Sequence, residues 1–288
     1  MNKPPSQPMQ RSSGLRLAGR PIRIGAGIPL APDRRTPVWA DIRSAAESLA
    51  QREPLLGARL RSLVLANDNL GAGISAVLAR RLASEDLDEH ALRELFTSVA
   101  DDAFAEKVAA DLRAVRERDP AGGDELHVLL NFKGFQALQT YRIAHALWLD
   151  GRTELAHALS NQASLVFAVD IHPAARIGTG VMFDHGTGIV IGETTLIEDN
   201  VSLLQNVTLG GTGKEHGDRH PKIRSGVMIG AGAKILGNID IGTMSKVAAG
   251  SVVLQPVPPH TTVAGVPARV VRQHNDDSCP SVEMDQRI

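Results

Sequence analysis

The sequence predicts an α+β protein, with an N-terminal all-α domain followed by a left-handed parallel β-helix of hexapeptide repeats. Three observations favour this class. Apolar residues keep helical spacing up to about residue 167, they recur every sixth residue beyond it, and the 288-residue chain has 27 Gly but only 3% aromatic residues. The predicted division is a disordered basic leader (1–37), a helical domain (38–167), the β-helix (168–271) and a flexible tail (272–288).

The composition excludes several classes of protein. A single Cys rules out a disulfide framework and a multi-Cys zinc site. A formal net charge of −1 gives no reason to expect nucleic acid or an anionic membrane as partner. The longest uncharged stretch, 247–268, holds four Pro residues, so it cannot form a membrane-spanning helix. The basic leader superficially resembles a transit peptide, but Pro residues at its start disfavour a helix, and we expect a cytoplasmic protein.

The helical domain is predicted from amphipathic periodicity. Between 87 and 104, apolar residues form one stripe and charged residues fill the other side. Similar patterns cover 38–51, 55–66, 70–83, 105–117, 135–150 and 153–167. The breaks fall at turn-forming residues such as Pro54, Pro120 and Gly151. The pattern predicts a bundle of helices and indicates no chemistry of its own.

The β-helix is predicted from apolar residues six positions apart, a period that fits neither a helix nor a free strand. The columns are Ile171, Ile177, Phe183 and Ile189, then, after a two-residue slip, Ile191, Ile197, Leu203 and Leu209, then, after a gap of fourteen, Ile223, Ile229, Ile235, Ile241, Val247 and Val253. Each is expected to point into a narrow coil that has room for aliphatic side chains. Only one of the nine aromatic residues, Phe183, lies in the repeats, which explains the low aromatic content.

Interruptions of the repeat are the first places to look for function, because insertions in a solenoid form loops that often bind ligands. The largest lies between Leu209 and Ile223 and contains Arg219, His216 and His220. A basic, Gly-rich loop can approach an anionic ligand closely, but an ordinary surface loop has the same composition.

Charged residues among the coil positions are the second anomaly. Asp170 precedes Ile171, and Asp184 and His185 follow Phe183. A carboxylate beside an imidazole orients the ring and stabilises its protonated form, which equips the ring as a general base. A surface ion pair or a capped turn is the alternative interpretation.

Several strings resemble the serine O-acetyltransferases, a family of the hexapeptide acyltransferase superfamily. In the helical half they are RERDP (116–120) and KGFQALQ (133–139). In the repeats they are VDIHPAA (169–175), DHGTG (184–188), TLGGTGK (208–214), GDRHPKI (217–223), GAGAKILGN (230–238) and VLQPVPPHTTVAGVPAR (253–269). The resemblance runs from about residue 38 to 271. It implies acetyl transfer from acetyl-CoA to the hydroxyl of L-serine, which gives O-acetyl-L-serine for L-cysteine biosynthesis.

The resemblance also implies roles for individual residues. His185 matches the general base and Asp170 its partner. The matches for binding the serine amino group are Asp119 and Asp184, those for its carboxylate are Arg219 and His220, and those for CoA are Gly211, Ala231, Lys246 and Ala249. No metal is expected. The stretch 242–249 departs from the family pattern at Met244 and Ser245, which makes Lys246 and Ala249 the least secure matches.

The family resemblance implies partners as well. A homotrimer or a dimer of trimers is expected, with active sites between neighbouring subunits, and L-cysteine is expected to inhibit at the serine site. The chain ends in Ile288, which matches the residue that inserts into O-acetylserine sulfhydrylase.

Three alternatives remain open on the sequence. The same scaffold serves homoserine and xenobiotic acetyltransferases. It also serves γ-type carbonic anhydrases, whose zinc needs three converging His ligands, and four residues offer them: His172, His185, His216 and His220. A catalytically inactive scaffold for the sulfhydrylase is the third alternative, which retention of Asp170 and His185 disfavours.

Overall fold

The structure is a computed structural model that describes residues 38–213, 216–274 and 278–288. All of them belong to one compact unit, Asp33–Ile288. The predicted leader, 1–37, lies outside the described residues. No helix in the described ranges is long and apolar enough to cross a membrane.

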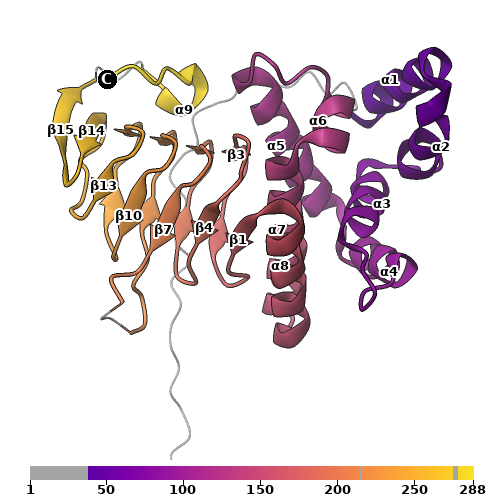
Figure 1. Cartoon of the computed structure of the whole chain (residues 1–288), viewed down its shortest axis with the longest axis horizontal. Coiled ribbons are helices and arrows are strands. Elements are labelled where there is room, and N and C mark those ends of the chain that lie inside the picture. The colour runs from indigo at the N-terminus through magenta and orange to yellow at the C-terminus, as the bar shows by residue number, and fades with distance from the viewer. Residues whose placement is uncertain (1–37, 214–215, 275–277) are drawn as a thin grey trace, which may run out of the picture. The chain divides into compact units, whose positions relative to one another are not determined.

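The N-terminal half is helical, as the periodicity predicts (Figure 1). Its α-helices are α1 (Val38–Arg52), α2 (Gly57–Leu60), α3 (Leu70–Leu82), α4 (Glu89–Val99), α5 (Asp102–Arg118), α6 (Glu125–Asn131), α7 (Lys133–Leu149) and α8 (Thr153–Phe167). A 3₁₀ turn (Pro54–Leu56) precedes α2, and a π-helical turn (Arg61–Leu65) follows it. Side-chain caps start four of the helices: the side chains of Asn69, Asp88, Asp101 and Asp124 each accept a hydrogen bond from a backbone N–H in the first turn.

From Val169 the chain winds into a parallel β-solenoid whose short strands stack in three sheets. The five-stranded sheet contains β1 (Val169–Ile171), β4 (Ile189–Ile191), β7 (Thr208–Gly210), β10 (Lys234–Leu236) and β13 (Val252–Val253). The four-stranded sheet contains β2 (Arg176–Ile177), β5 (Leu196–Ile197), β8 (Lys222–Ile223) and β11 (Asp240–Ile241). The six-stranded sheet contains β3 (Met182–Phe183), β6 (Ser202–Leu203), β9 (Met228–Ile229), β12 (Lys246–Val247), β14 (Thr261–Gly265) and β15 (Ala268–Gln273). The predicted fold class, a helical domain followed by a parallel β-helix, is confirmed.

The strand register explains the six-residue period. Ile171 pairs with Ile191, Ile191 with Leu209, and Leu209 with Ile235, so the predicted apolar positions form continuous stacks. Ile191, Leu209 and Ile235 have at most 1% of their surface exposed. Each coil therefore buries one aliphatic residue per side against its neighbours, which is the physical origin of the pattern.

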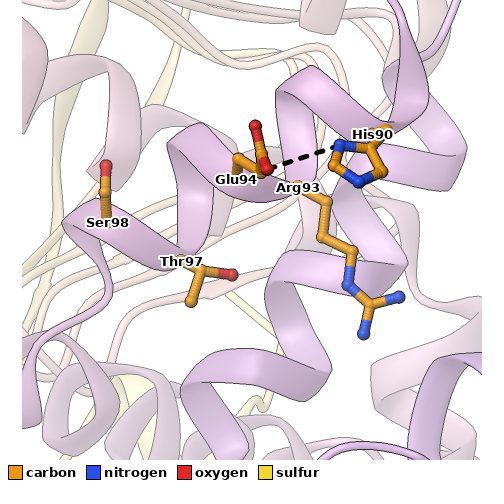
Figure 2. Close-up of a pocket in the computed structure, with 5 residues that line it drawn as sticks. All are labelled: His90, Arg93, Glu94, Thr97 and Ser98. Atoms are coloured by element: carbon orange, nitrogen blue, oxygen red, sulfur yellow. Dashed lines mark ion pairs between the residues drawn. The ribbon is translucent and has the colours of Figure 1, made fainter.

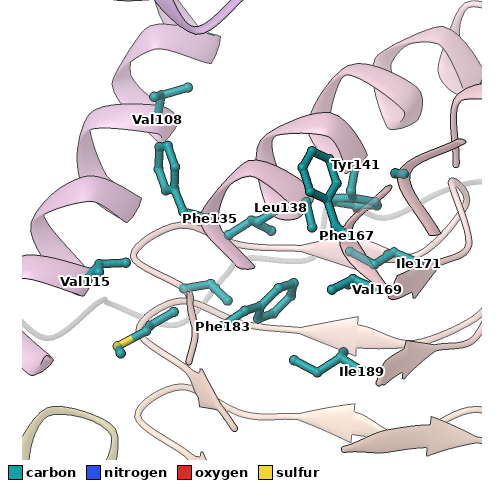
Figure 3. Packing of buried hydrophobic residues seen from close by; sticks show 14 of the residues in the cluster. Val108, Val115, Phe135, Leu138, Tyr141, Phe167, Val169, Ile171, Phe183 and Ile189 are labelled. Atoms are coloured by element: carbon teal, nitrogen blue, oxygen red, sulfur yellow. The ribbon is translucent and has the colours of Figure 1, made fainter. Parts of the chain in front are cut away.

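The two domains share one hydrophobic core. Phe167 ends α8, and it packs with Phe135 of α7 and with Phe183 of the coil in a single buried cluster (Figure 3). Asp111 of α5 accepts a hydrogen bond from the Val181 backbone N–H at 3.0 Å, which ties α5 to the first coil. The helical domain is thus fixed to the first coil by apolar packing and by buried hydrogen bonds.

The C-terminal segment returns toward the helices. β15 runs antiparallel to β14 and extends past the predicted domain boundary at residue 271. The short helix α9 (Pro280–Glu283) then packs near α5, where the Ser202 hydroxyl donates to the Ser281 carbonyl at 2.8 Å. The segment predicted as a flexible tail, 272–288, therefore contains a strand end and a helical turn.

Candidate active site

The turn after β3 carries the proposed base. Phe183 and Ile191 are eight residues apart, whereas Leu203 and Leu209 on the next coil are six apart, so two extra residues widen this turn. His185 takes a left-handed backbone conformation, with φ of 55°, which is uncommon outside Gly. Its imidazole is 75% exposed, and its Nε2 lies 3.8 Å from the Asp184 carboxylate. The sequence irregularity therefore marks a turn that projects an imidazole outward.

Asp119, from the helical domain, lines the same cavity as Asp184 and His185 of the coil. It follows the last residue of α5, and its carboxylate accepts a hydrogen bond from the Ala121 N–H at 2.8 Å. The preceding residue, Arg118, is buried and donates to the Ser202 hydroxyl at 3.1 Å, which anchors the end of α5 on the coil. A cavity of about 560 Å³ is lined by Asp119, Asp184 and His185, with further residues from α6 and the start of α7.

The cavity suits a cationic ligand. Burial raises the pKa of the Asp184 carboxyl above its usual value, the nearby Asp119 carboxylate raises it further, and His185 opposes both effects. Two carboxylates facing one cavity favour binding of an ammonium group, because a bound cation relieves both the desolvation and the mutual repulsion.

A second cluster surrounds Arg219 and His220. The Arg219 guanidinium pairs with the Glu193 carboxylate at 2.7 Å. The Thr194 hydroxyl accepts from the backbone N–H groups of Arg219 and His220 at 3.0 and 3.1 Å, and its oxygen lies 2.9 Å from His220 Nδ1. Burial and the neighbouring Arg219 lower the pKa of His220. Because Nδ1 also accepts from the Thr194 N–H at 3.2 Å, the free Nε2 carries the proton of a neutral ring.

The two clusters lie along different edges of the coil. The first edge consists of the turns from the six-stranded to the five-stranded sheet, at 184–188, 204–207, 230–233 and 248–251. The second edge consists of the turns from the five-stranded to the four-stranded sheet, at 172–175, 192–195, 211–221 and 237–239. His185 is on the first edge, and Arg219 and His220 are on the second. The five-stranded sheet, which faces the viewer in Figure 1, separates them within one chain.

Asp170 lies on that separating sheet. It is the middle residue of β1, and its side chain is exposed. Within the described part of one chain, no hydrogen bond or ion pair joins Asp170 to His185. Asp170 acts electrostatically on His172 instead, where it opposes the lowering of the imidazole pKa by burial.

Three of the residues matched to CoA contacts lie on the two edges, and the fourth, Lys246, lies in the six-stranded sheet. Ala231 and Ala249 occupy successive turns of the first edge, where the Gly250 N–H donates to the Ala231 carbonyl at 2.8 Å. Gly211 begins the inserted loop on the second edge. Lys246 is buried in β12, and its Nζ donates to the backbone carbonyls of Asp285 and Arg287, so the C-terminal segment contacts it.

The chain end is accessible. Ile288 is 60% exposed, and its carbonyl oxygen accepts from the Arg272 guanidinium at 3.2 Å.

Another hollow lies in the helical domain. Figure 2 shows its lining on α4: His90, Arg93, Glu94, Thr97 and Ser98. Its only ion pair among the residues drawn, between His90 and Glu94, joins two highly exposed side chains. It contains none of the predicted site residues. Among the described residues, no three His, Cys, Asp or Glu side chains gather as a metal site, so the His set weighed for zinc has no cluster there to support it.

Sequence reasoning missed three residues that support the clusters. Thr194 and Glu193 hold His220 and Arg219, and Lys133 lines the Asp119–Asp184 cavity. The GET sequence at 192–194 follows a column residue at a second-edge turn, which is a signal that a search limited to insertions overlooks.

A parallel β-helix with an Asp–His pair at a break in its repeats belongs to the class that the sequence suggested, the hexapeptide-repeat acyltransferases. A family model described as the N-terminal domain of serine acetyltransferase matches residues 38–140. A serine acetyltransferase from Salmonella typhimurium is 57% identical over 253 residues, which cover 87% of this chain and 92% of that protein. The chain therefore belongs to the serine acetyltransferase family.

Solved structures agree with this assignment. A serine acetyltransferase in complex with cysteine is 52% identical and superposes with a TM-score of 0.85, over 87% of this chain and 98% of the other. A serine acetyltransferase from Brucella abortus in complex with coenzyme A is 48% identical, with a TM-score of 0.81, over 83% and 96% of the two chains.

Proposed function

We propose that this protein transfers the acetyl group of acetyl-CoA to the hydroxyl of L-serine, giving O-acetyl-L-serine and CoA for L-cysteine biosynthesis. The main supporting observation is the cavity lined by Asp119, Asp184 and His185, in a chain 57% identical to a serine acetyltransferase.

His185 acts as the general base. The imidazole removes the proton of the serine hydroxyl as the oxygen attacks the thioester carbonyl, and the resulting imidazolium returns a proton to the departing CoA thiolate. We propose that Asp170 stabilises the imidazolium, as carboxylates do in catalytic triads, although no hydrogen bond or ion pair joins the two residues within the described part of one chain. Positioned base catalysis of this kind typically contributes ~10²–10⁴-fold. The exposure of the ring on a widened turn supports this role, because the reacting hydroxyl must reach it.

The serine zwitterion is held at both ends. Asp119 and Asp184 bind the ammonium group, and Arg219 and His220 bind the carboxylate. The two pairs lie on different edges of one chain, so we propose that a neighbouring subunit of a homotrimer supplies the second pair. Pairing of two such trimers into a hexamer belongs to the same proposal.

Acetyl-CoA binds along the coil edges. The small side chains of Ala231 and Ala249 leave room at successive turns of the first edge, and Gly211 begins the loop beside Arg219. Lys246 is the fourth proposed CoA contact, and it can reach CoA only when it releases the carbonyls of the C-terminal segment. No metal is required.

Regulation and location complete the proposal. L-cysteine, which has a thiol in place of the serine hydroxyl, inhibits by occupying the serine site. The exposed Ile288 anchors O-acetylserine sulfhydrylase, and the protein acts in the cytoplasm. Removal of Ile288 is expected to abolish binding to the sulfhydrylase with acetyl transfer intact. Unchanged affinity would exclude this anchor.

A thiol-release assay tests the activity. Purified full-length protein with acetyl-CoA and L-serine is expected to release CoA, to be inhibited by added L-cysteine, and to be slower with L-homoserine. Faster turnover of homoserine, or no release with either acceptor, would contradict the proposed function.

A further inference from the structure

The turn that carries His185 has few restraints on the imidazole itself. Apart from its 3.8 Å approach to Asp184, the His185 ring makes no hydrogen bond to the described residues, and three quarters of the side chain is exposed. Its left-handed backbone conformation persists only where the surroundings hold it. The position of the ring therefore depends on what fixes the backbone of turn 184–188.

The N-terminal end of α7 contacts this turn directly. A Cβ atom on Gly134 would overlap the Phe183 carbonyl oxygen, and a Cβ atom on Gly186 would lie 2.9 Å from the Gly134 Cα. The two backbones are thus in van der Waals contact. Figure 3 shows the next residue, Phe135, pointing into the core that also contains Phe183. The start of α7 is consequently a rigid surface against which the turn rests.

Lys133, the first residue of α7, adds a polar link. Its Nζ donates a hydrogen bond to the Thr187 hydroxyl, within the same turn. Other side chains of α7 hold earlier parts of the first coil: Tyr141 donates to the Ala175 carbonyl, and Arg142 donates to the Gly178 carbonyl at 2.6 Å. In the described ranges, the Lys133–Thr187 bond is the one side-chain hydrogen bond from the helical domain to turn 184–188. Lys133 also lines the cavity of Asp119 and Asp184.

We propose that Lys133 is a positioning residue for His185, which acts through Thr187 to hold turn 184–188 against α7. This inference rests on the proposed function, in which His185 is the base. Without the Lys133–Thr187 hydrogen bond, the part of turn 184–188 around Thr187 is less restrained, so the imidazole spends less time aligned with the serine hydroxyl. The chemical step slows as a result. Serine binding is preserved, because the Asp184 backbone N–H donates to the Leu203 carbonyl at 2.9 Å and Asp119 follows α5, outside the turn.

Four variants test the Lys133–Thr187 hydrogen bond. Lys133→Met keeps the length of the lysine side chain, and Thr187→Val keeps the shape of the threonine side chain. The other two are the double variant and Lys133→Arg. Lys133→Met and Thr187→Val are each expected to lower kcat about tenfold, the usual effect of losing a hydrogen bond to a charged group, with the KM for serine unchanged. The double variant is expected to fall no further, because both changes remove the same bond. Lys133→Arg retains a donor and is expected to recover most of the activity.

Hydrogen exchange provides a readout that does not depend on activity. Peptides spanning 182–190 are expected to exchange faster in Lys133→Met and Thr187→Val than in the unchanged protein. Lys107→Met, which removes an exposed lysine of α5, is the matched control and is expected to alter neither exchange nor kcat.

Three results would overturn the proposal. Unchanged exchange and kcat in both single variants would show that the bond does not hold the turn. Multiplicative losses in the double variant would show that the residues act separately. A raised KM for serine in Lys133→Met alone would make Lys133 a substrate ligand. An unchanged protein that releases no CoA with serine would contradict the proposed function instead, and the exchange experiment would still decide whether Lys133 holds the turn.

Discussion

Two interruptions of the β-helix, turn 184–188 and loop 211–221, differ in charge and in how they are held. The turn contributes an imidazole and a carboxylate, and its shape is set by backbone packing against α7. The loop contributes Arg219 and His220, which are held by the side chains of Glu193 and Thr194. The turn is anionic and is held by backbone packing and by the Lys133–Thr187 hydrogen bond, whereas the loop is cationic and is held by an ion pair and by hydrogen bonds to Thr194.

This contrast shows how a regular coil acquires a polar site. A hexapeptide repeat alone buries aliphatic residues and offers no pocket, so ligand-binding groups appear where residues are added to it. Opposite charges on two separate edges suit a zwitterion only when a second chain brings the edges together. A substitution in one region leaves the other region as an internal reference.

The largest effect is expected at the base. His185→Ala is expected to lower kcat by about 10²–10⁴-fold, because the serine hydroxyl loses its proton acceptor. Thiol release measures the rate, and circular dichroism checks that the fold is retained. Near-normal turnover would remove His185 from the mechanism.

The second effect concerns the cationic loop. Arg219→Ala is expected to lower kcat/KM for serine by about 10–100-fold through loss of a charge-assisted hydrogen bond to the carboxylate. The KM for acetyl-CoA is expected to stay unchanged. Arg224→Ala is the matched control, because Arg224 also forms an ion pair, with Glu198, but lies at the turns from the four-stranded to the six-stranded sheet and has no proposed ligand. Equal losses in the two variants would point to a structural effect of charge removal.

A smaller effect is expected from the residue that supports His220. Thr194→Val removes the hydroxyl beside His220 Nδ1 and is expected to reduce kcat/KM for serine about three- to tenfold. By proton NMR titration, the pKa of His220 in the unchanged protein is expected below 6.5, since burial disfavours the charged ring. A value above 6.5 would mean that the ring is held as a cation.

The smallest effect is a gain in stability. The folded-state pKa of Asp184 is raised, so its ionised form destabilises the fold above that pKa, and the cost disappears at pH below the unfolded value of 3.8. Asp184→Asn is expected to raise the Tm at pH 7 by about 2–4 °C, the shift that ~1 kcal/mol yields at this size, and to abolish serine binding. Calorimetry measures the shift, with exposed Asp150→Asn as control. A lowered Tm would mean that His185 stabilises the carboxylate more than burial opposes it.

The coil could be predicted from the sequence because its core repeats locally. Each side of a coil buries one aliphatic residue, so apolar residues recur about every six positions, and equivalent residues of successive coils, such as Ile171 and Ile191, stack on one another. The candidate base could be located because Asp184 and His185 are charged or ionisable residues directly after the column residue Phe183, and the family resemblance then assigned the base role to His185. The contact of Lys133 with Thr187 could not, since the residues are 54 positions apart and meet only through the packing of α7 on the first coil. The contact of Lys246 with the C-terminal segment could not be predicted either, because it forms only when that segment folds back onto the coil.

Subunit complementation measures whether the site is shared between the first edge of one chain and the second edge of the next. His185→Ala and Arg219→Ala chains are produced separately and together, and thiol release with serine is compared at equal total protein. Mixed trimers are expected to recover a substantial fraction of the activity, because some interfaces then join an intact His185 to an intact Arg219. Activity no greater than the sum of the two variants alone would contradict the shared site.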